Sequence, residues 1–340
     1  MASSPADARP DLLEVERLRV RFRTMGAIRA RLAGVADPFL DAVLDVSFTL
    51  KAGTTFALVG ESGSGKTTLG RAILGLVPVH SGTVRFDGKA VQGTSDSAFQ
   101  PLRRRIAMMF QDPVASLSPR LTVKSLITEP FLIHGLRDRN LDQEAKRLLD
   151  MVGLPAGFVA RYPHELSGGQ ARRVGVARAL ALTPKLIIAD EPTAGLDVSV
   201  QGEILNLMNR LQQELGLAYL IITHNLAVVR HISDEMAIMY MGRFVERGPT
   251  SRIFAAPAHP YTHGLLAAEP HPDPDRRRQQ VELKGEVPSL ARRPTGCEFH
   301  TRCPHARDNC RSDLPAPHDL GPGHRVLCHY PLLGEEARVA

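Results

Sequence analysis

A glycine-rich stretch at residues 60–67 carries the clearest chemistry in the sequence. It reads GESGSGKT and fits the pattern G-x-x-x-x-G-K-[ST]. A short apolar run, TFALV at residues 55–59, precedes it, and a helical pattern at residues 68–76 follows it. Glycines let backbone N–H groups turn inward around phosphate oxygens, and the following helix adds its positive N-terminal end. The stretch therefore predicts a loop that binds the phosphates of a nucleotide.

The residues of this loop have different expected roles. We expect Lys66 to reach the β- and γ-phosphates of a nucleoside triphosphate and the hydroxyl of Thr67 to bind Mg²⁺. The other nucleotide contacts predicted in the loop and the first helical turn are Gly60, Glu61, Ser62, Gly63, Ser64, Gly65 and Thr68. The alternative is a glycine-rich turn without function. The strand before the stretch and the helix after it favour the phosphate loop.

A pair of carboxylates follows a second apolar run. Residues 185–189 read KLIIA and lead into Asp190 and Glu191. Ligands bind at the C-terminal ends of buried parallel strands. We expect Asp190 to hold Mg²⁺, directly or through water, and Glu191 to orient and polarise an attacking water. Such a pair is common in turns, so this expectation depends on the phosphate loop.

The sequence LSGGQ at residues 166–170 lies just before a long helical pattern at residues 171–181. At a helix N-terminus, Ser167 and the N–H groups of Gly168 and Gly169 would form an anion site. The alternative is an ordinary capped helix start, because Ser is a good N-cap.

The order of apolar runs and helical patterns predicts the elements that must position these residues. Apolar runs recur at residues 55–59, 185–189 and 218–222, with helical patterns between them, which indicates the buried parallel strands of an α/β fold. Residues 43–50, VLDVSFTL, predict another strand. Residues 12–22 alternate between apolar and polar, as in an edge strand.

Two regions depart from this core. The pattern between residues 111 and 179 is mostly helical, which predicts an inserted helical subdomain at about residues 112–178. From residue 257 onward Pro, His and Arg dominate, which predicts a loop-rich tail over residues 257–340 and places the main domain at residues 11–256.

Composition excludes several classes of protein. There is no apolar run of about 18 residues and no secretory leader, so we expect a cytosolic chain without a membrane span. The net charge is +6, but the arginines are spread along the chain without an aromatic-basic motif. This favours a solvated surface and no nucleic-acid partner.

The motif LSGGQ, placed between the phosphate loop and the acidic strand end, resembles the ABC ATPase family. The resemblance implies a P-loop NTPase fold with a RecA-like α/β sheet, an antiparallel β edge and an inserted helical subdomain. It implies ATP and Mg²⁺ as ligands. It also implies that two such domains pack head to tail, with each ATP between residues 60–67 of one and Ser167, Gly168, Gly169 and Gln170 of the other.

The remaining motifs of the family match in order. Gln111 resembles the glutamine that touches Mg²⁺ and the nucleophilic water. His224 resembles the switch histidine at the γ-phosphate, although a lone His after a strand is usually structural. Asp197 lies in AGLD, where many relatives have SALD. For the aromatic that stacks on adenine we expect Phe22, with Phe39 second. A core role is the alternative for both.

Several stretches resemble the oligopeptide, dipeptide and nickel importer branch, closest to its F-type ATPase subunit: FQDPVASLSPR (110–120), DEPTAGLDVSVQ (190–201), HPYT (259–262), GEVPSL (285–290) and GCEFHTRC (296–303). The resemblance implies a D-type ATPase as partner in a heterodimer, two transmembrane permease subunits and an extracytoplasmic solute-binding protein. It places the chain peripherally at the cytoplasmic face of the inner membrane, with a permease helix in a groove near residues 111–119. Peptide is the expected cargo, and nickel stays open.

The chain has four cysteines, all in the tail: Cys297, Cys303, Cys310 and Cys328. Their spacing, C-x5-C-x6-C-x17-C, lacks the tight pairs of zinc sites, whereas thiolates on separate loops can hold a [4Fe–4S] cluster, as in some relatives. Zinc and unmetallated thiols remain alternatives, and disulfides are not expected in a cytosolic chain. A metal here would fasten a tail that lacks its own core.

Two functions of other classes remain as alternatives. One is a soluble ABC ATPase acting on nucleic acid or the ribosome, but such proteins usually have two ATPase domains or long coiled coils. The other is a non-enzymatic metal sensor. The set of Lys66, Asp190, Glu191 and His224 argues for a working ATPase instead.

Overall fold

The computed structural model describes residues 9–26, 29, 32, 38–91, 96–111, 116–269, 283 and 285–334. The chain forms two compact units. The first comprises residues 1–13, 49–55 and 86–223, and the second comprises residues 14–48, 56–85 and 224–340. Among the described residues, no helix has both the length and the apolar character that a bilayer crossing needs.

The first unit contains a parallel sheet. Its strands are β6 (Ile106–Met109), β7 (Leu186–Asp190) and β8 (Ala218–Thr223), in the order β8-β7-β6. Leu186 pairs with Ile106 on one side and with Ala218 on the other. Every residue of β7 and β8 is buried, as the continuous apolar runs predict.

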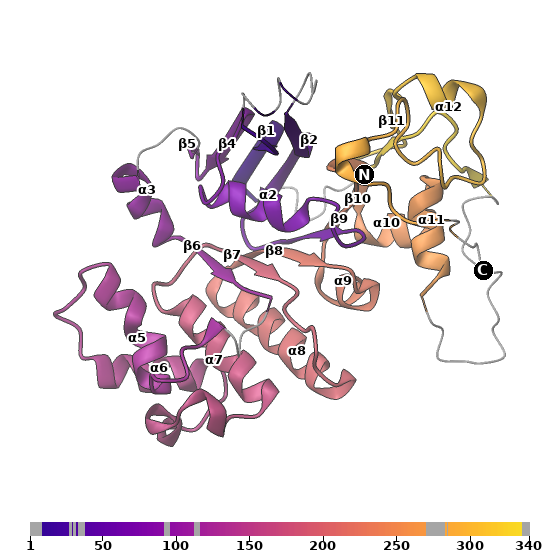
Figure 1. The fold of residues 1–340 in the computed structure, drawn as a ribbon. Helices are drawn as coiled ribbons and strands as arrows, with labels where there is room; N and C mark the ends of the chain where they lie inside the picture. The colour runs from indigo at the N-terminus through magenta and orange to yellow at the C-terminus, as the bar shows by residue number, and fades with distance from the viewer. Residues whose placement is uncertain are drawn as a thin grey trace. The chain divides into compact units, whose positions relative to one another are not determined.

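Helices make up the rest of the first unit, and α5, α6 and α7 pack against one another (Figure 1). Thr122 caps α5 and Asn140 caps α6 through side-chain oxygens that accept backbone N–H groups, so local sequence sets where both helices start. The helices and the remaining short strand are α3 (Asp96–Arg103), α5 (Val123–Ile133), α6 (Leu141–Met151), η1 (Ala156–Ala160), η2 (Pro163–Glu165), α7 (Gly168–Leu180), α8 (Val198–Leu215) and β5 (Lys89–Ala90).

The second unit contains a mixed sheet in the order β11-β12-β10-β9-β3. Strand β3 (Thr55–Val59) runs parallel to β9 (Glu235–Tyr240), and β9 pairs antiparallel with β10 (Arg243–Pro249). Further along the chain, β12 (Arg325–Leu327) pairs with β10, and β11 (Pro317–Asp319) pairs with β12. The C-terminal region therefore extends this sheet. A separate sheet has the order β2-β1-β4, from β2 (Phe39–Lys51), β1 (Asp11–Arg23) and β4 (Ser81–Phe86).

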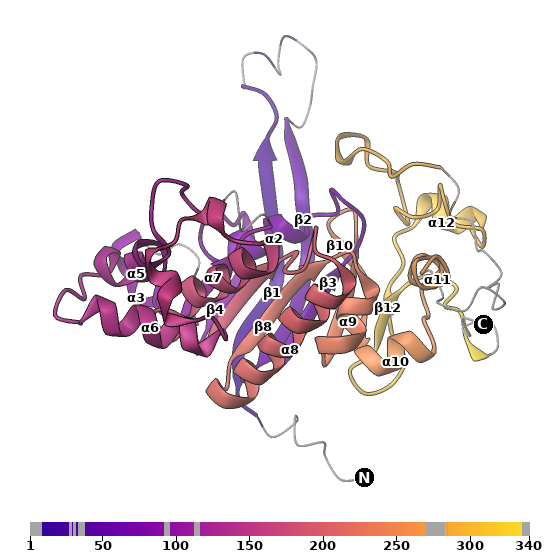
Figure 2. The same ribbon diagram turned by 90° about the horizontal axis from the view of Figure 1, so that it is seen from below.

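The tail is built into the core of the second unit. Tyr240 of β9, Tyr261 of α11 and Phe299 form an aromatic cluster with ring centroids 4.8–5.4 Å apart. All three rings are at most 1% exposed. The helices here are α2 (Lys66–Ile73), α9 (Leu226–Ile232), α10 (Thr250–Ala255), α11 (Pro260–Ala267), η3 (Leu290–Arg292) and α12 (Asp308–Ser312). In both views α10, α11 and α12 lie together near the tail strands (Figures 1 and 2). Besides the expected loops, this region thus supplies strands and a buried aromatic residue.

Candidate nucleotide-hydrolysis site and cysteine cavity

The phosphate loop in the second unit has a backbone that requires glycine. Buried strand β3 delivers the chain to Gly60, and α2 begins at Lys66. Gly60 and Gly65 have φ of 153° and 106°, and a Cβ on either would lie 2.2 Å from a carbonyl oxygen, of Met239 and Ala42 respectively. No other residue fits these positions without displacing the neighbouring backbone. The spacing of glycines in the motif is therefore a steric requirement of the fold.

Lys66 lies at the centre of this loop. Its side chain is buried, and its Nζ donates hydrogen bonds to the carbonyl oxygens of Gly60 at 2.7 Å and Glu61 at 2.8 Å and to Oγ of Ser64 at 3.3 Å. Gly65, the N-cap of α2, offers no side-chain cap, and Thr67 lies in the first turn. The loop thus combines an ammonium group with a helix N-terminus that has no capping side chain, which suits an anion.

Three further residues predicted to contact the nucleotide, His224, Phe22 and Phe39, lie in the second unit and are exposed. His224 follows β8 directly and precedes Asn225, whose side chain caps α9. Phe22 is 40% exposed and Phe39 is 44% exposed, so neither ring belongs to the core. The Arg21 guanidinium lies 5.0 Å from the centre of the Phe39 ring, a cation–π contact.

The acidic strand end lies in the first unit, where β7 ends at the buried Asp190. Glu191 follows in a left-handed conformation, with φ of 51°. Its N–H donates to the carbonyl oxygen of Ile222 at 2.7 Å, and Oγ1 of Thr223 donates to its carboxylate at 3.0 Å. A non-glycine residue in this conformation costs on the order of 1–3 kcal/mol. Both partners, Ile222 and Thr223, lie at the end of β8, and these hydrogen bonds hold Glu191 in this strained position.

Arg172 in α7 joins three motifs of the first unit. Its buried guanidinium donates to the carbonyl oxygen of Ala194 at 2.7 Å and lies 3.4 and 3.5 Å from the carbonyl oxygens of Gln111 and Glu191. The structure thus brings together Gln111, Glu191 and the loop before Asp197. The sequence analysis missed Arg172. The sequence feature that could have identified Arg172 is its position in a helix between apolar residues, beside Ala171, which is also buried.

The LSGGQ stretch forms the start of α7. Ser167 Oγ accepts the Gln170 N–H at 3.3 Å, and Gln170 Oε1 accepts the Ser167 N–H at 3.1 Å, a reciprocal capping box. A Cβ on Gly169 would lie 2.8 Å from Val200 of α8, which explains the small residue there. The capped helix start is confirmed, and it leaves Ser167 and Gly168 exposed. Asp197, at the N-cap position of α8, is also exposed.

The four cysteines line one small cavity in the second unit, together with histidines that include His259, His300 and His329. All are free thiols, with Cys310 and Cys328 buried and the other two half-buried. Burial raises the thiol pKa of Cys297 to about 11 and that of Cys328 to about 12, and charge on the neighbouring cysteines adds to both shifts. Without a metal the thiols of Cys297 and Cys328 are therefore protonated at neutral pH.

Among the described residues, no group of three or more His, Cys, Asp or Glu side chains is arranged to hold a single metal ion. One buried polar atom at this cavity nevertheless has no hydrogen-bond partner among the described residues, the Nε2 of His259. Its Nδ1 accepts the Tyr261 N–H at 3.0 Å, so Nε2 carries the proton of the neutral ring. Burial lowers the pKa of His259 to about 4 and keeps the ring neutral.

Comparison with known proteins identifies the family. The model of the ABC transporter family matches residues 43–194, and that of the oligopeptide/dipeptide transporter C-terminal region matches residues 245–310. A probable peptide ABC transporter ATP-binding protein of Sinorhizobium fredii is 50% identical over 319 residues, which cover 94% of this chain and 89% of that one. The oligopeptide transport ATP-binding protein AppF of Bacillus subtilis is 47% identical over 294 residues, covering 85% and 89%.

Solved structures agree with the fold. The ATP-binding cassette MJ0796, dimeric in a post-hydrolysis state with ADP and Pi, aligns with a TM-score of 0.61 at 27% identity and covers 70% of this chain and 99% of that one. CbiO1 from Clostridium perfringens gives a TM-score of 0.61 at 28% identity, covering 72% and 91%. The predicted cassette fold and ATP hydrolysis are therefore confirmed, and the chain belongs to the ATP-binding proteins of ABC transporters, in the branch that carries the oligopeptide/dipeptide transporter C-terminal region.

Proposed function

We propose that this chain energises the import of dipeptides or oligopeptides by binding and hydrolysing ATP. The observation that carries the proposal is the match of residues 245–310 to the oligopeptide/dipeptide transporter C-terminal region, in a chain whose relatives are named as peptide transport ATP-binding proteins. Import of nickel or another solute by the same kind of machine is the alternative, because an ATP-binding subunit does not form the cargo site.

The hydrolysis mechanism follows from the residues described above. We propose that Lys66 and the N–H groups at the start of α2 bind the phosphates. Thr67, Asp190 and Gln111 would hold Mg²⁺, which would supply positive charge to neutralise the phosphates. Glu191, oriented by Thr223, accepts a proton from the attacking water, and His224 contacts the γ-phosphate. Residues 167–170 and Asp197 act on the ATP of a second cassette packed head to tail. Phe22 stacks on adenine.

The proposed assembly extends beyond this chain. We assign it as the F-type subunit, paired with a D-type ATPase, two permease subunits and an extracytoplasmic solute-binding protein, at the cytoplasmic face of the membrane. We also keep the proposed division into an ATPase domain at residues 11–256, with its helical subdomain, and an extension at residues 257–340.

A groove in the first unit supports a permease contact. It has a volume of about 250 Å³ and is lined by residues of β6, α5 and α7, including Phe110, Leu117 and Ile133. Phe110 is 47% exposed and Ile133 is 64% exposed. Of the residues expected near this site, 111–119, Ser116 and Leu117 line the groove, and residues 112–115 lie outside the described part. An apolar floor of this kind suits an amphipathic helix of a membrane partner.

The test of this function is uptake by cells that lack the native gene and carry either this chain or Glu191→Gln. Radiolabelled dipeptide, oligopeptide and Ni²⁺ are supplied separately. We expect peptide uptake only with the unmodified chain. Uptake of Ni²⁺ but not of peptide would replace the peptide assignment with the alternative. Within the same assay, Ile133→Asp should abolish uptake while nucleotide binding persists, and normal uptake would refute the groove.

We further propose that Cys297, Cys303, Cys310 and Cys328 hold a [4Fe–4S] cluster, with zinc as the alternative. Each iron of such a cluster takes one thiolate, so the four sulfurs need not converge on one point. The Nε2–H of His259 at the same cavity has no hydrogen-bond partner in the described part of the chain, which supports a bound group with acceptor atoms, such as cluster sulfide. The cluster would fasten the cysteine-bearing loops to one another.

Protein purified without oxygen would be analysed for iron, zinc and acid-labile sulfide. We expect about four irons with matching sulfide, and loss of both in Cys310→Ser. One zinc without sulfide would establish the alternative, and protein without metal would refute both.

A further inference from the structure

The second residue of the phosphate loop is held by the tail of the chain. Both oxygens of the Glu61 carboxylate accept hydrogen bonds from the Arg302 guanidinium, at 3.1 and 3.2 Å. The Arg302 side chain is 8% exposed and that of Glu61 is 26% exposed. Such a two-point pair fixes the orientation of a carboxylate as well as neutralising it. The two residues are 241 positions apart in the sequence.

The backbone of the same residue is also held by the tail region. The N–H of Glu61 donates to the hydroxyl of Tyr261 at 3.1 Å. Tyr261 is fully buried in the aromatic cluster with Tyr240 and Phe299. This hydrogen bond uses the N–H of Glu61, so that group points toward α11 and not toward the interior of the loop. The tail therefore determines where the backbone N–H and the carboxylate of Glu61 point.

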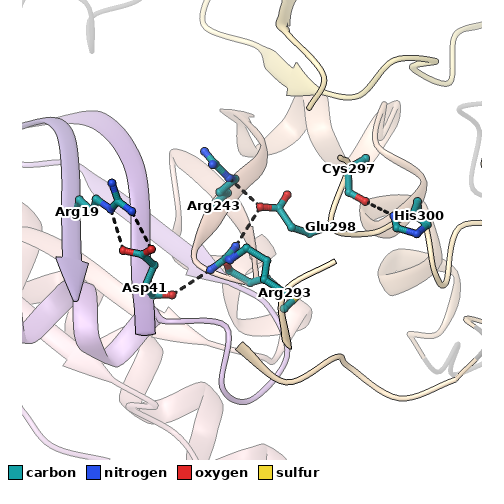
Figure 3. Close-up of polar contacts among 8 residues, drawn as sticks. Arg19, Asp41, Arg243, Arg293, Cys297, Glu298 and His300 are labelled. Carbon is teal, nitrogen blue, oxygen red and sulfur yellow. Dashed lines mark hydrogen bonds and ion pairs between the residues drawn. The ribbon is translucent and has the colours of Figure 1, made fainter. Parts of the chain in front are cut away.

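The segment that carries Arg302 is anchored on a second side. Glu298 accepts hydrogen bonds from Arg243 at 2.9 Å and Arg293 at 3.0 Å, and Arg293 also donates to the Asp41 carbonyl oxygen at 3.0 Å. Asp41 in turn pairs with Arg19 at 2.8 Å. Figure 3 shows this network running from strand β2 to the residue beside Cys297. These hydrogen bonds hold the segment that carries Arg302 in place.

The negative charge of Glu61 explains why the phosphate loop needs the ion pair with Arg302. A carboxylate in a loop that binds a triphosphate repels the phosphates, and Lys66 is already engaged with the carbonyl oxygens of the loop. Pairing with Arg302 cancels the negative charge and draws the carboxylate toward the tail. If Arg302 only anchored the tail, the effect of removing it would not depend on the charge of Glu61. The structural role and the neutralising role can therefore be distinguished by experiment.

We propose that Arg302 is a positioning residue for nucleotide binding: it neutralises and orients Glu61 so that the phosphate loop accepts a triphosphate. The inference rests on the assignment of residues 60–67 as the phosphate loop. Nucleotide binding then requires a residue outside the nucleotide motifs, Arg302, which directly precedes Cys303.

The test is a double-mutant cycle on the full chain with Arg302→Ala, Glu61→Gln and the double variant. MgATP, MgADP and AMP are titrated calorimetrically. We expect Arg302→Ala to weaken MgATP binding about tenfold, because an unpaired carboxylate then faces the phosphates. The loss should shrink from ATP to ADP to AMP. KM for ATP should rise while kcat is retained. In the double variant the charge is gone, so affinity should recover to that of Glu61→Gln alone.

Three controls separate the possible failures. Lys66→Ala should abolish MgATP binding; if it does not, the phosphate-loop assignment itself fails. Arg325→Ala removes a tail arginine from the exposed pair with Asp319 and should leave affinity unchanged. If Arg302→Ala fails to fold, Arg302→Lys replaces it in the test. Because Arg302→Lys keeps the positive charge, it should bind MgATP with most of the affinity of the unmodified chain. Equal losses for all three nucleotides, or a double variant as weak as Arg302→Ala, would overturn the proposal.

Discussion

Replacing Arg172 by Met should slow ATP turnover without preventing ATP binding. Arg172 contacts the carbonyl oxygens of Gln111, Glu191 and Ala194. Met keeps much of the buried apolar volume, so the substitution removes mainly hydrogen bonds. The phosphate loop has its own hydrogen bonds, formed by Lys66, and these do not involve Arg172.

The magnitude follows from the three contacts. The bond to Ala194 at 2.7 Å is short and charge-assisted, worth about 1.5–3 kcal/mol. The contacts to Gln111 and Glu191 at 3.4 and 3.5 Å lie at the edge of hydrogen-bond geometry and add less. Since Met also removes the cost of burying a charge, the net loss of stability should be about 1–3 kcal/mol. A displacement of Glu191 by about 1 Å costs on the order of 100-fold in rate.

The assay is steady-state ATP hydrolysis together with urea unfolding and nucleotide titration. We expect kcat to fall about 10- to 100-fold, with the affinity for MgATP within about threefold of the unmodified chain. The matched control is Arg173→Met at the next position, which breaks an ion pair with the exposed Glu203 and a bond to the Val152 carbonyl oxygen. An unchanged kcat in Arg172→Met with lowered stability would show that Arg172 is only structural and refute the reasoning.

Three further results are expected. Glu191→Gln should lower kcat by about 100-fold or more and retain bound ATP, measured by filter binding; retained turnover would exclude Glu191 as the base. Gly169→Ala should destabilise the protein by about 1–3 kcal/mol in urea unfolding because its Cβ meets Val200 at 2.8 Å, and Val200→Ala in the same chain should restore part of the loss; an additive loss would contradict this clash. The hydrogen bond from Arg19, with the charges of Arg19, Arg21 and Arg293, holds the pKa of Asp41 below its ordinary value of 3.8, although burial opposes the shift. A lowered folded-state pKa stabilises above the unfolded value, so Asp41→Asn should lower Tm at pH 7, and the deficit should shrink as pH falls below about 4; a deficit constant with pH would refute the ion pair.

The sequence predicts those parts of the structure that depend on local pattern. Strands β3, β7 and β8 are buried on both faces, so their apolar runs are continuous and unmistakable. The glycines of the phosphate loop are dictated by positive φ at Gly60 and Gly65. Ser167 and Gln170 form a capping box, and this motif can be recognised from four consecutive residues of the sequence.

The contacts that the sequence analysis missed are long-range. Strands β11 and β12 have three residues each, too short for a periodic pattern, and β12 exists because β10 offers it an edge. The sequence does not distinguish Arg172 and Arg302 from the other arginines, because their hydrogen-bond acceptors lie in distant segments of the chain. The roles of the nucleotide motifs and the division at residue 257 stay predictions.

We expect the contact between Arg302 and Glu61 to couple the cysteine segment to nucleotide binding. Arg302 lies next to Cys303, so whatever orders the segment at residues 296–303 also orders the partner of the phosphate loop. Coupling between two binding events is reciprocal, so if this segment favours ATP binding, ATP orders the segment by the same free energy. In metal-free full-length protein we therefore expect MgATP to slow alkylation of Cys303, followed by mass spectrometry, relative to protein without nucleotide. Arg302→Ala should remove this protection and Arg325→Ala should keep it. Equal alkylation rates with and without ATP in the unmodified chain would show that the tail and the loop are in contact without being coupled.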